Sequence, residues 1–169
     1  MAELAPQERL QPSLLDRLTD EEADREQESR DKRVLSFQRL RESVLRDLSW
    51  LLNTGNLTQT TDLTNYPHVA TSVLNYGMPE LAGHIPSSTD VVRIEREVRQ
   101  AIWNFEPRIL RNTVKVRFSH NPEDMTHNAL TFEIEGELWS QPIPEQLFLR
   151  TEIDLESGGV RIKTSQDFR

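Results

Sequence analysis

The chain has 169 residues, no cysteine and a formal net charge of −8, and 28% of its residues are charged. The missing cysteines exclude disulfides, thiolate catalysis and cysteine metal sites. The acidic balance argues against nucleic acid and anionic membrane surfaces as partners, because both attract clustered basic side chains. No stretch approaches the roughly 20 apolar residues that cross a bilayer, and the N-terminus has no apolar signal run. We therefore expect a cytoplasmic protein without direct membrane insertion.

Residues 1–32 are predicted to form a flexible acidic tail ahead of a single domain over residues 33–169. Between Asp20 and Arg33 nearly every side chain is charged or polar, so apolar burial cannot offset the entropy of ordering. Within this tail Ser13 can cap a short helix. Its leucines share one face at helical spacing, namely Leu10, Leu14, Leu15 and Leu18. The helix either lies on its own domain or is a docking peptide that orders on a partner, and both readings stay open.

Three helices are expected next. The first covers residues 34–52, with an apolar stripe at spacings of three and four and a charged opposite side that includes Arg46 and Asp47. It is expected to end at Asn53, with Gly55 as a left-handed cap. Pro67 is expected to start a second helix that stops at Gly77. The third covers residues 89–105 with the apolar face Val91, Ile94, Val98, Ala101, Ile102 and Phe105.

After residue 108 the apolar period changes from about 3.6 to 2, which indicates strands. Alternating runs lie at residues 114–118, 130–138, 147–155 and 160–164, and short turns separate them. Consecutive strands joined by short turns form an antiparallel meander, and the helices then cover one of its faces. The predicted fold class is α+β, with N-terminal helices packed on one face of a C-terminal antiparallel β-meander.

An enzyme is the first functional class to weigh. Glu133, Glu135 and Glu137 share one strand face at about 7 Å spacing, within the range of paired carboxylates in inverting glycosidases. Cross-strand pairing with Lys115 and Arg117 explains the same residues without catalysis. No compact histidine spacing indicates a metal site, and no motif calls for a cofactor. We therefore expect no catalytic, metal or cofactor site, and a murein hydrolase is kept as the alternative.

The segment from Trp103 to Arg108 is a different kind of candidate, a site that could bind a partner. Pro107 disfavours helical geometry at Glu106, so the third helix ends there and a rigid corner leads into the sheet. Such a corner can present an acid, a base and an aromatic ring to a partner at low entropic cost, and Trp and Arg are frequent interface anchors. Alternatively, Glu106 and Arg108 tie the corner to their own domain. These residues alone leave both interpretations open.

Four segments in this order resemble the phage baseplate wedge family, and within it the TssE family of the bacterial type VI secretion system. The resemblance spans nearly the whole chain. Its motifs are Pro12-Ser13-Leu14-Leu15-Asp16-Arg17-Leu18, Ser43-Val44-Leu45-Arg46-Asp47-Leu48 with Leu51-Leu52-Asn53-Thr54, Ser72-Val73-Leu74-Asn75-Tyr76-Gly77-Met78-Pro79 with Leu81-Ala82-Gly83, and Phe105-Glu106-Pro107-Arg108.

The resemblance implies a structural subunit of the type VI baseplate. Such proteins join TssF and TssG in the TssK-containing baseplate at the inner membrane, and they offer a docking surface for sheath proteins TssB and TssC. The resemblance also assigns Glu106, Pro107 and Arg108 to contacts with the baseplate core. The expected partner-binding residues are therefore these three with Trp103, Leu14, Leu15 and Leu18. An accessible strand edge suits sheath docking, and residues 160–164 are the natural candidate.

Overall fold

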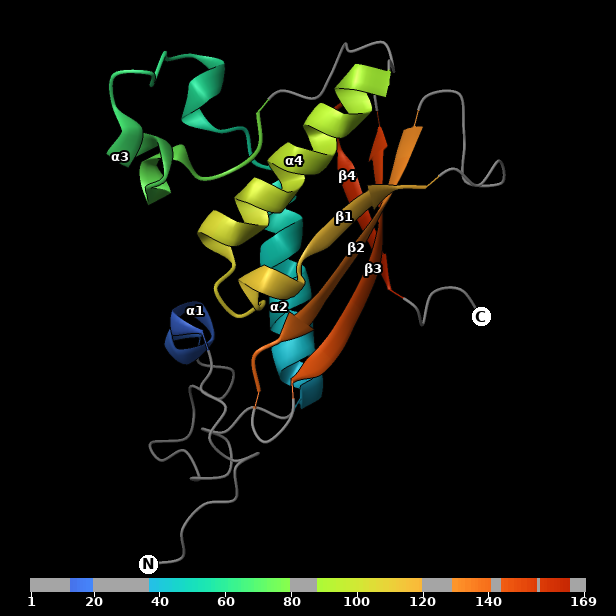
Figure 1. Ribbon diagram of the computed structural model, residues 1–169. Helices are drawn as coiled ribbons and strands as arrows, with labels where there is room; N and C mark the ends of the chain where they lie inside the picture. The colour runs from blue at the N-terminus through green and yellow to red at the C-terminus, as the bar shows by residue number, and fades with distance from the viewer. Residues whose placement is uncertain are drawn as a thin grey trace, which may run out of the picture.

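The computed structural model describes residues 13–19, 37–79, 88–119, 129–140, 144–154 and 156–164. The expected turn at residues 121–124, Leu10, and the histidines His84, His120 and His127 lie outside these ranges. Within them the chain folds as helices followed by a sheet, so the α+β prediction is confirmed (Figure 1).

The sheet has four antiparallel strands in the order β1-β2-β3-β4, which is also their order in the chain. The strands are β1 (Lys115–Phe118), β2 (Ala129–Leu138), β3 (Glu145–Asp154) and β4 (Val160–Thr164). The alternating pattern of residues explains the two faces, because successive side chains point to opposite sides. Phe132, Ile134, Leu149 and Ile153 are buried on the inner face. β1 and β4 are the two edges of the sheet.

Two long helices form the layer that covers this inner face: α2 (Phe37–Leu52) and α4 (Ser88–Phe105). α4 packs along β1 and α2 packs along β4, and the two helices contact each other (Figure 1). Leu48 and Ile102 are fully buried where the helical stripes meet the sheet. The core therefore lies between one helical layer and one sheet layer, as the apolar periodicities predicted.

The connection between these helices corrects two expectations. Gly55 does not form a left-handed cap; the positive-φ glycines of the described residues are Gly77 and Gly158. Gly77, with φ of 117°, lies against Thr54, where a Cβ atom would come within 2.3 Å of the carbonyl oxygen.

The predicted second helix is broken into α3 (Pro67–Ala70) and the 3-10 turn η4 (Val73–Asn75), after another such turn, η3 (Leu57–Gln59). The break has a local cause. The Ser72 hydroxyl accepts from the Leu74 N–H, and the Asn75 side chain donates to the Ala70 carbonyl. Ser and Asn side chains commonly compete with helical hydrogen bonds in this way.

Two further short elements complete the fold: α1 (Leu14–Leu18) and η5 (Arg111–Thr113). α1 comes from the predicted tail, yet it lies near the end of the helical layer where α4 stops (Figure 1). None of the helices in the described ranges is long and apolar enough to cross a membrane.

Candidate functional site

The corner after α4 is fixed by backbone hydrogen bonds on both sides of Pro107. The Glu106 N–H makes the last helical bond, to the Ile102 carbonyl at 2.9 Å. Beyond the proline, the Trp139 N–H donates to the Arg108 carbonyl at 2.7 Å and ties the corner to the end of β2. The helix therefore ends at the predicted residue, and the corner is held rigidly between α4 and the sheet.

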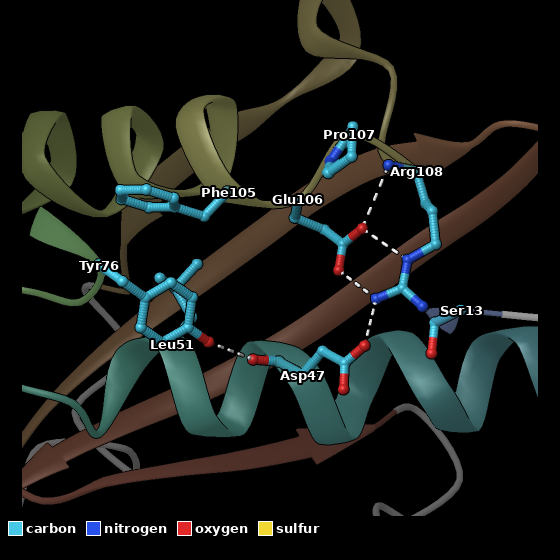
Figure 2. A pocket seen from close by; sticks show the side chains of 8 residues that line it. All are labelled: Ser13, Asp47, Leu51, Tyr76, Phe105, Glu106, Pro107 and Arg108. Carbon is cyan, nitrogen blue, oxygen red and sulfur yellow. Dashed lines mark hydrogen bonds and ion pairs between the residues drawn. The ribbon is translucent and has the colours of Figure 1, made fainter. Parts of the chain in front are cut away.

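Glu106 points into the protein and not toward solvent. Its side chain is 3% exposed, and it accepts three hydrogen bonds from Arg108. The backbone N–H and Nε of Arg108 donate to Glu106 Oε1 at 3.1 and 2.7 Å, and Nη2 donates to Oε2 at 2.6 Å (Figure 2). This is the bidentate geometry in which an arginine binds a carboxylate most strongly. Between these paired residues, Pro107 is exposed.

Helix α2 supplies the other partners of Arg108. Nη2 donates to Asp47 Oδ2 at 2.6 Å (Figure 2). Nη1 donates to the Ser43 hydroxyl at 3.1 Å. Ser43 and Asp47 stand one helical turn apart and so face the same way. The expectation that Asp47 belongs to the solvent side of its helix is wrong, because packing of α2 against the corner turns it toward Arg108.

The electrostatics favour a charged arginine. Burial on its own would lower the pKa of Arg108, but hydrogen bonds and charge from Glu106, and then from Asp47, outweigh burial and raise that pKa above its usual range. Burial, followed by the negative charges of Asp47 and Glu106, raises the pKa of the Tyr76 hydroxyl. The cluster is thus an ion pair extended by a second carboxylate, with the cation at its centre.

The ionic cluster continues from Asp47 to the short helix α1. Arg46 donates through Nε to Asp47 Oδ1 at 2.9 Å and through Nη1 to Asp16 Oδ1 at 2.6 Å. Asp16 also accepts from the Ser13 hydroxyl at 2.6 Å. The two residues form the capping box of α1, in which the Asp16 N–H donates to Ser13 Oγ at 3.2 Å and the Ser13 N–H donates to Asp16 Oδ2 at 3.3 Å. We call the chain Asp16–Arg46–Asp47–Arg108–Glu106 the corner network. It joins two segments that the sequence showed as unrelated: the leucine segment and the corner.

The corner network holds α1 by its polar face, which leaves the leucines outside. Leu14 and Leu18 are 70% and 73% exposed, and Leu15 is 43% exposed. Neither of the two readings of the leucine segment, a helix that lies on its own domain or a docking peptide that orders on a partner, describes this arrangement by itself. The helix lies on its own domain through Asp16, while the leucines that a partner would need remain accessible.

An open pocket of about 380 Å³ lies between α1, α2 and the corner (Figure 2). Its apolar side contains Leu51, Tyr76 and Phe105, and the two rings meet edge to face with centroids 5.3 Å apart. Its polar side is lined by residues of the corner network and by Ser13. The arrangement can receive an apolar side chain next to a polar group.

Trp103 stands apart from this pocket. Two guanidinium groups lie over its ring, with the Cζ atoms of Arg99 and Arg111 at 5.7 and 4.9 Å from the ring centroid. Its Nε1 is buried and has no hydrogen-bond partner within the described part of the chain. Stacked cations of this kind stabilise the ring where it is. Trp103 thus does not line the pocket with Glu106 and Arg108, although the sequence placed all three in one segment.

The carboxylates considered for catalysis lie on the open face of the sheet and have cross-strand partners. Glu135 pairs with Lys115 at 3.9 Å, Glu133 pairs with Arg150 at 3.5 Å, and the Gln146 amide donates to Glu137 at 2.8 Å. The expected cross-strand pairing is therefore confirmed for Lys115, while Arg117 stands opposite Glu133 in register. Among the residues that the structure describes, no group of acidic, histidine or cysteine side chains could hold a metal ion.

Five residues of the site were not predicted to be functional from the sequence: Asp16, Ser43, Arg46, Asp47 and Tyr76. One signal was available. Ser43 interrupts the apolar stripe of α2 next to Val44 and is itself buried, and a buried hydroxyl requires a partner. The hydroxyl donates to the Leu40 carbonyl at 3.0 Å within its own helix. Its second partner, Arg108, could not be read locally because it lies 65 residues away.

Comparison with known proteins identifies the family to which the chain is similar. A family model described as "Baseplate wedge protein gp25" matches residues 38–143, well over half of the chain. Among solved structures, a Geobacter sulfurreducens protein described as a candidate tail lysozyme is similar at 22% identity, with a TM-score of 0.45, over 69% of this chain and 92% of that one. A search of curated proteins gave no match.

Proposed function

Since the chain belongs to the baseplate wedge protein gp25 family, a structural component of phage-tail-like contractile systems, we propose that it is the TssE-type wedge subunit of a type VI secretion baseplate. In this proposal it joins TssF and TssG in the TssK-containing baseplate, in the cytoplasm at the inner membrane. It also offers a docking surface on which TssB and TssC begin to form the contractile sheath.

The observation that carries the proposal is the corner network. Glu106 and Asp47 hold the Arg108 guanidinium from two sides, while Asp47 and Asp16 hold Arg46. One continuous set of ion pairs thereby fixes α1 beside the corner. The result is a preformed surface, with exposed leucines and an exposed Pro107 around an open pocket. Preorganisation of this kind lowers the entropic cost of assembly.

Within this surface the residues take different roles. The buried Glu106 positions Arg108, and the contact with TssF and TssG is made by Pro107, the accessible part of Arg108, and Leu14, Leu15 and Leu18. Trp103 belongs to a neighbouring part of the same surface, stiffened by Arg99 and Arg111. Because Glu106 is buried, it acts on the proposed interface by positioning Arg108 and does not itself touch the partner.

The proposal is tested by co-purification of the chain with TssF and TssG. The double substitution Leu14→Ser and Leu18→Ser should weaken capture at least tenfold, because two exposed apolar anchors are lost. The free protein should unfold at an unchanged temperature, since both side chains are exposed. Val92→Ser is the matched control: Val92 is 64% exposed on α4 and should leave capture unchanged. Equal capture by all three proteins would exclude α1 from the interface.

Arg108→Lys tests the corner in the same assay. Lysine keeps the charge but cannot bond Glu106, Asp47 and Ser43 together through a planar fork. We expect capture by TssF and TssG to fall more than with Val92→Ser. Circular dichroism checks that the variant stays folded, and undiminished capture by a folded Arg108→Lys protein would contradict the role of the corner.

For sheath docking we propose the edge strand β4. In an antiparallel pair, residues alternate between bonding their neighbour and pointing their N–H and C=O groups away from it. The Asp154 N–H bonds the Gly159 carbonyl, so the peptide groups of Val160 and Ile162 point away from β3. Unpaired groups at a sheet edge can receive another strand.

Ile162→Pro tests this edge while sparing the pairing with β3. Proline removes only an N–H that faces outward, and edge positions of this kind tolerate it. We expect the variant to keep its secondary structure and to lose nucleation of TssB–TssC polymerisation. Normal nucleation by folded Ile162→Pro protein would exclude β4 as the docking edge.

A further inference from the structure

The outer edge of β4 is not open along its whole length, because the side chain of Asn53 covers its beginning. The Asn53 Oδ1 accepts from the Val160 N–H at 2.8 Å, and its Nδ2 donates to the Val160 carbonyl at 2.9 Å. The second Nδ2 hydrogen goes to the Ser49 carbonyl at 2.8 Å, within the last turn of α2. The side-chain amide thus bonds the N–H and C=O of Val160 as one residue of an antiparallel neighbouring strand would.

The orientation of this amide is fixed by its partners. The Val160 N–H requires an acceptor and the Val160 carbonyl requires a donor, so the amide oxygen and nitrogen each have one suitable place. Asn53 and Val160 are 107 residues apart, and the contact exists because α2 ends beside β4. The residue that ends the helix therefore also closes the first position of the strand edge.

The following outward position on β4 is different. By the alternation of the ladder, the N–H and C=O groups of Ile162 point away from β3, and no other group in the described ranges bonds them. At the opposite edge of the sheet, Glu95 of α4 accepts from the Phe118 N–H of β1 at 2.7 Å. Each edge strand is thus capped at one described position by a helix side chain, and the Asn53 amide bonds both the N–H and the C=O of its residue, Val160.

We propose that Asn53 is a register stop for strand addition. An extended strand of a partner that adds to β4 pairs from Ile162 onward and ends against the Asn53 amide. This inference rests on the proposed docking of the sheath at β4, and it names the residue that sets where the added strand lies. A stop is needed because side chains alternate with a period of two, so a strand can slip by two residues and keep its faces.

The chemistry of the edge also describes the incoming strand. Arg161 is exposed on the outer face of the sheet. It lies between Val160 and Ile162, whose N–H and C=O groups point away from β3. Opposite an added strand Arg161 occupies a non-hydrogen-bonded position, where facing Cβ atoms come closest. An acidic side chain opposite Arg161 is favoured by charge, so the geometry selects a strand with an acid at that register.

The test uses the absence of cysteine in the natural chain. Arg161→Cys introduces a single thiol at a position whose facing Cα distance of about 4.5 Å permits a disulfide. The probe is a panel of TssB–TssC heterodimers, each with one cysteine at successive residues of the segment that adds to β4. With Asn53 present, one panel position should dominate the cross-linked product.

Removing the stop should change this pattern. In the Asn53→Ala background, Arg161→Cys should also cross-link to the panel cysteine two residues away from the dominant position. This second product should make up at least a third of all cross-linked product. Amide exchange at Val160 should accelerate at least tenfold in the free protein. Asn53→Asp keeps the acceptor for the Val160 N–H but loses the donor, so it should give an intermediate pattern. Glu95→Gln alters the cap of β1 and should leave the β4 pattern unchanged.

The outcomes separate this inference from the proposal beneath it. An unchanged cross-link pattern in Asn53→Ala, with faster exchange at Val160, overturns the register stop and leaves docking at β4 standing. Unchanged exchange at Val160 overturns the stop as well. If no panel position cross-links in either background, docking at β4 fails and the stop fails with it.

Discussion

Asp47 of α2 and Arg108 of the corner are 61 residues apart in the chain and meet through a hydrogen-bonded ion pair of 2.6 Å. The same guanidinium nitrogen also bonds Glu106 at 2.6 Å, so Arg108 joins two carboxylates from different elements. This relationship gives the Glu-Pro-Arg corner a structural role inside its own domain. It also leaves the exposed parts of the corner free to meet a partner.

The coupling between Asp47 and Arg108 can be measured. We expect Asp47→Ala and Arg108→Ala each to destabilise the fold, and the double substitution to cost less than their sum by about 1–3 kcal/mol, as contacting residues in one network do. Urea unfolding of the four proteins gives the value. A coupling energy near zero would show that the pair makes no net contribution.

The attachment of α1 should depend on pH. Burial would raise the pKa of Asp16, but hydrogen bonds from Arg46 and Ser13 outweigh it and lower that pKa below its usual range. A lowered carboxyl pKa means that the stabilisation is complete above the ordinary value of about 3.9 and is lost as the pH falls through the lowered value. The amide resonances of α1 should therefore move to disordered positions only below about pH 4.

Asp16→Asn is the control for this titration. It removes the charge at all pH values, so α1 should be detached at neutral pH and show no transition in acid. Detachment of α1 in the natural protein between pH 5 and 7 would indicate that another titrating group holds it.

Gly77 should resist substitution more than Gly55. Gly77→Ala places a Cβ atom 2.3 Å from the Thr54 carbonyl oxygen at a φ of 117°, so we expect a loss of about 2 kcal/mol or more. Gly55→Ala would first meet the end of the Gln59 side chain, which can move away with the loss of its 3.2 Å bond to the Met78 carbonyl. Thermal unfolding compares the two, and equal midpoints would contradict the strain at Gly77.

The murein hydrolase alternative has a direct test. Glu133, Glu135 and Glu137 lie on the open face of the sheet with cross-strand partners, and a general acid needs a buried, apolar surrounding instead. We expect no clearing of a cell-wall suspension by the purified protein, and no effect of Glu135→Gln. Clearing that disappears with Glu135→Gln would restore the enzyme reading.

The parts of the fold that could be predicted are those with a strong local period. α4 and the strands lie within a few residues of their expected ranges because their apolar residues recur every three or four positions, or every second one. The helix expected from Pro67 was wrong where this signal was weak, and the Ser72 and Asn75 side chains decided the outcome. The Gly55 cap was wrong because the chain leaves α2 in a parallel bridge between Gly55 and Met78, and the left-handed glycine of this contact is Gly77.

The sequence by itself determined the α+β order of elements, the helix end at Pro107 and the charged outer face of the sheet, since each depends on neighbours in the chain. Only the tertiary structure decided which charged and polar groups are partners. Arg108 meets Asp47, Arg46 meets Asp16, and Asn53 meets Val160 across separations of 61, 30 and 107 residues. Such pairs follow from the packing of α2 beside the corner and the β4 edge, and packing is a property of the assembled core and not of any local pattern.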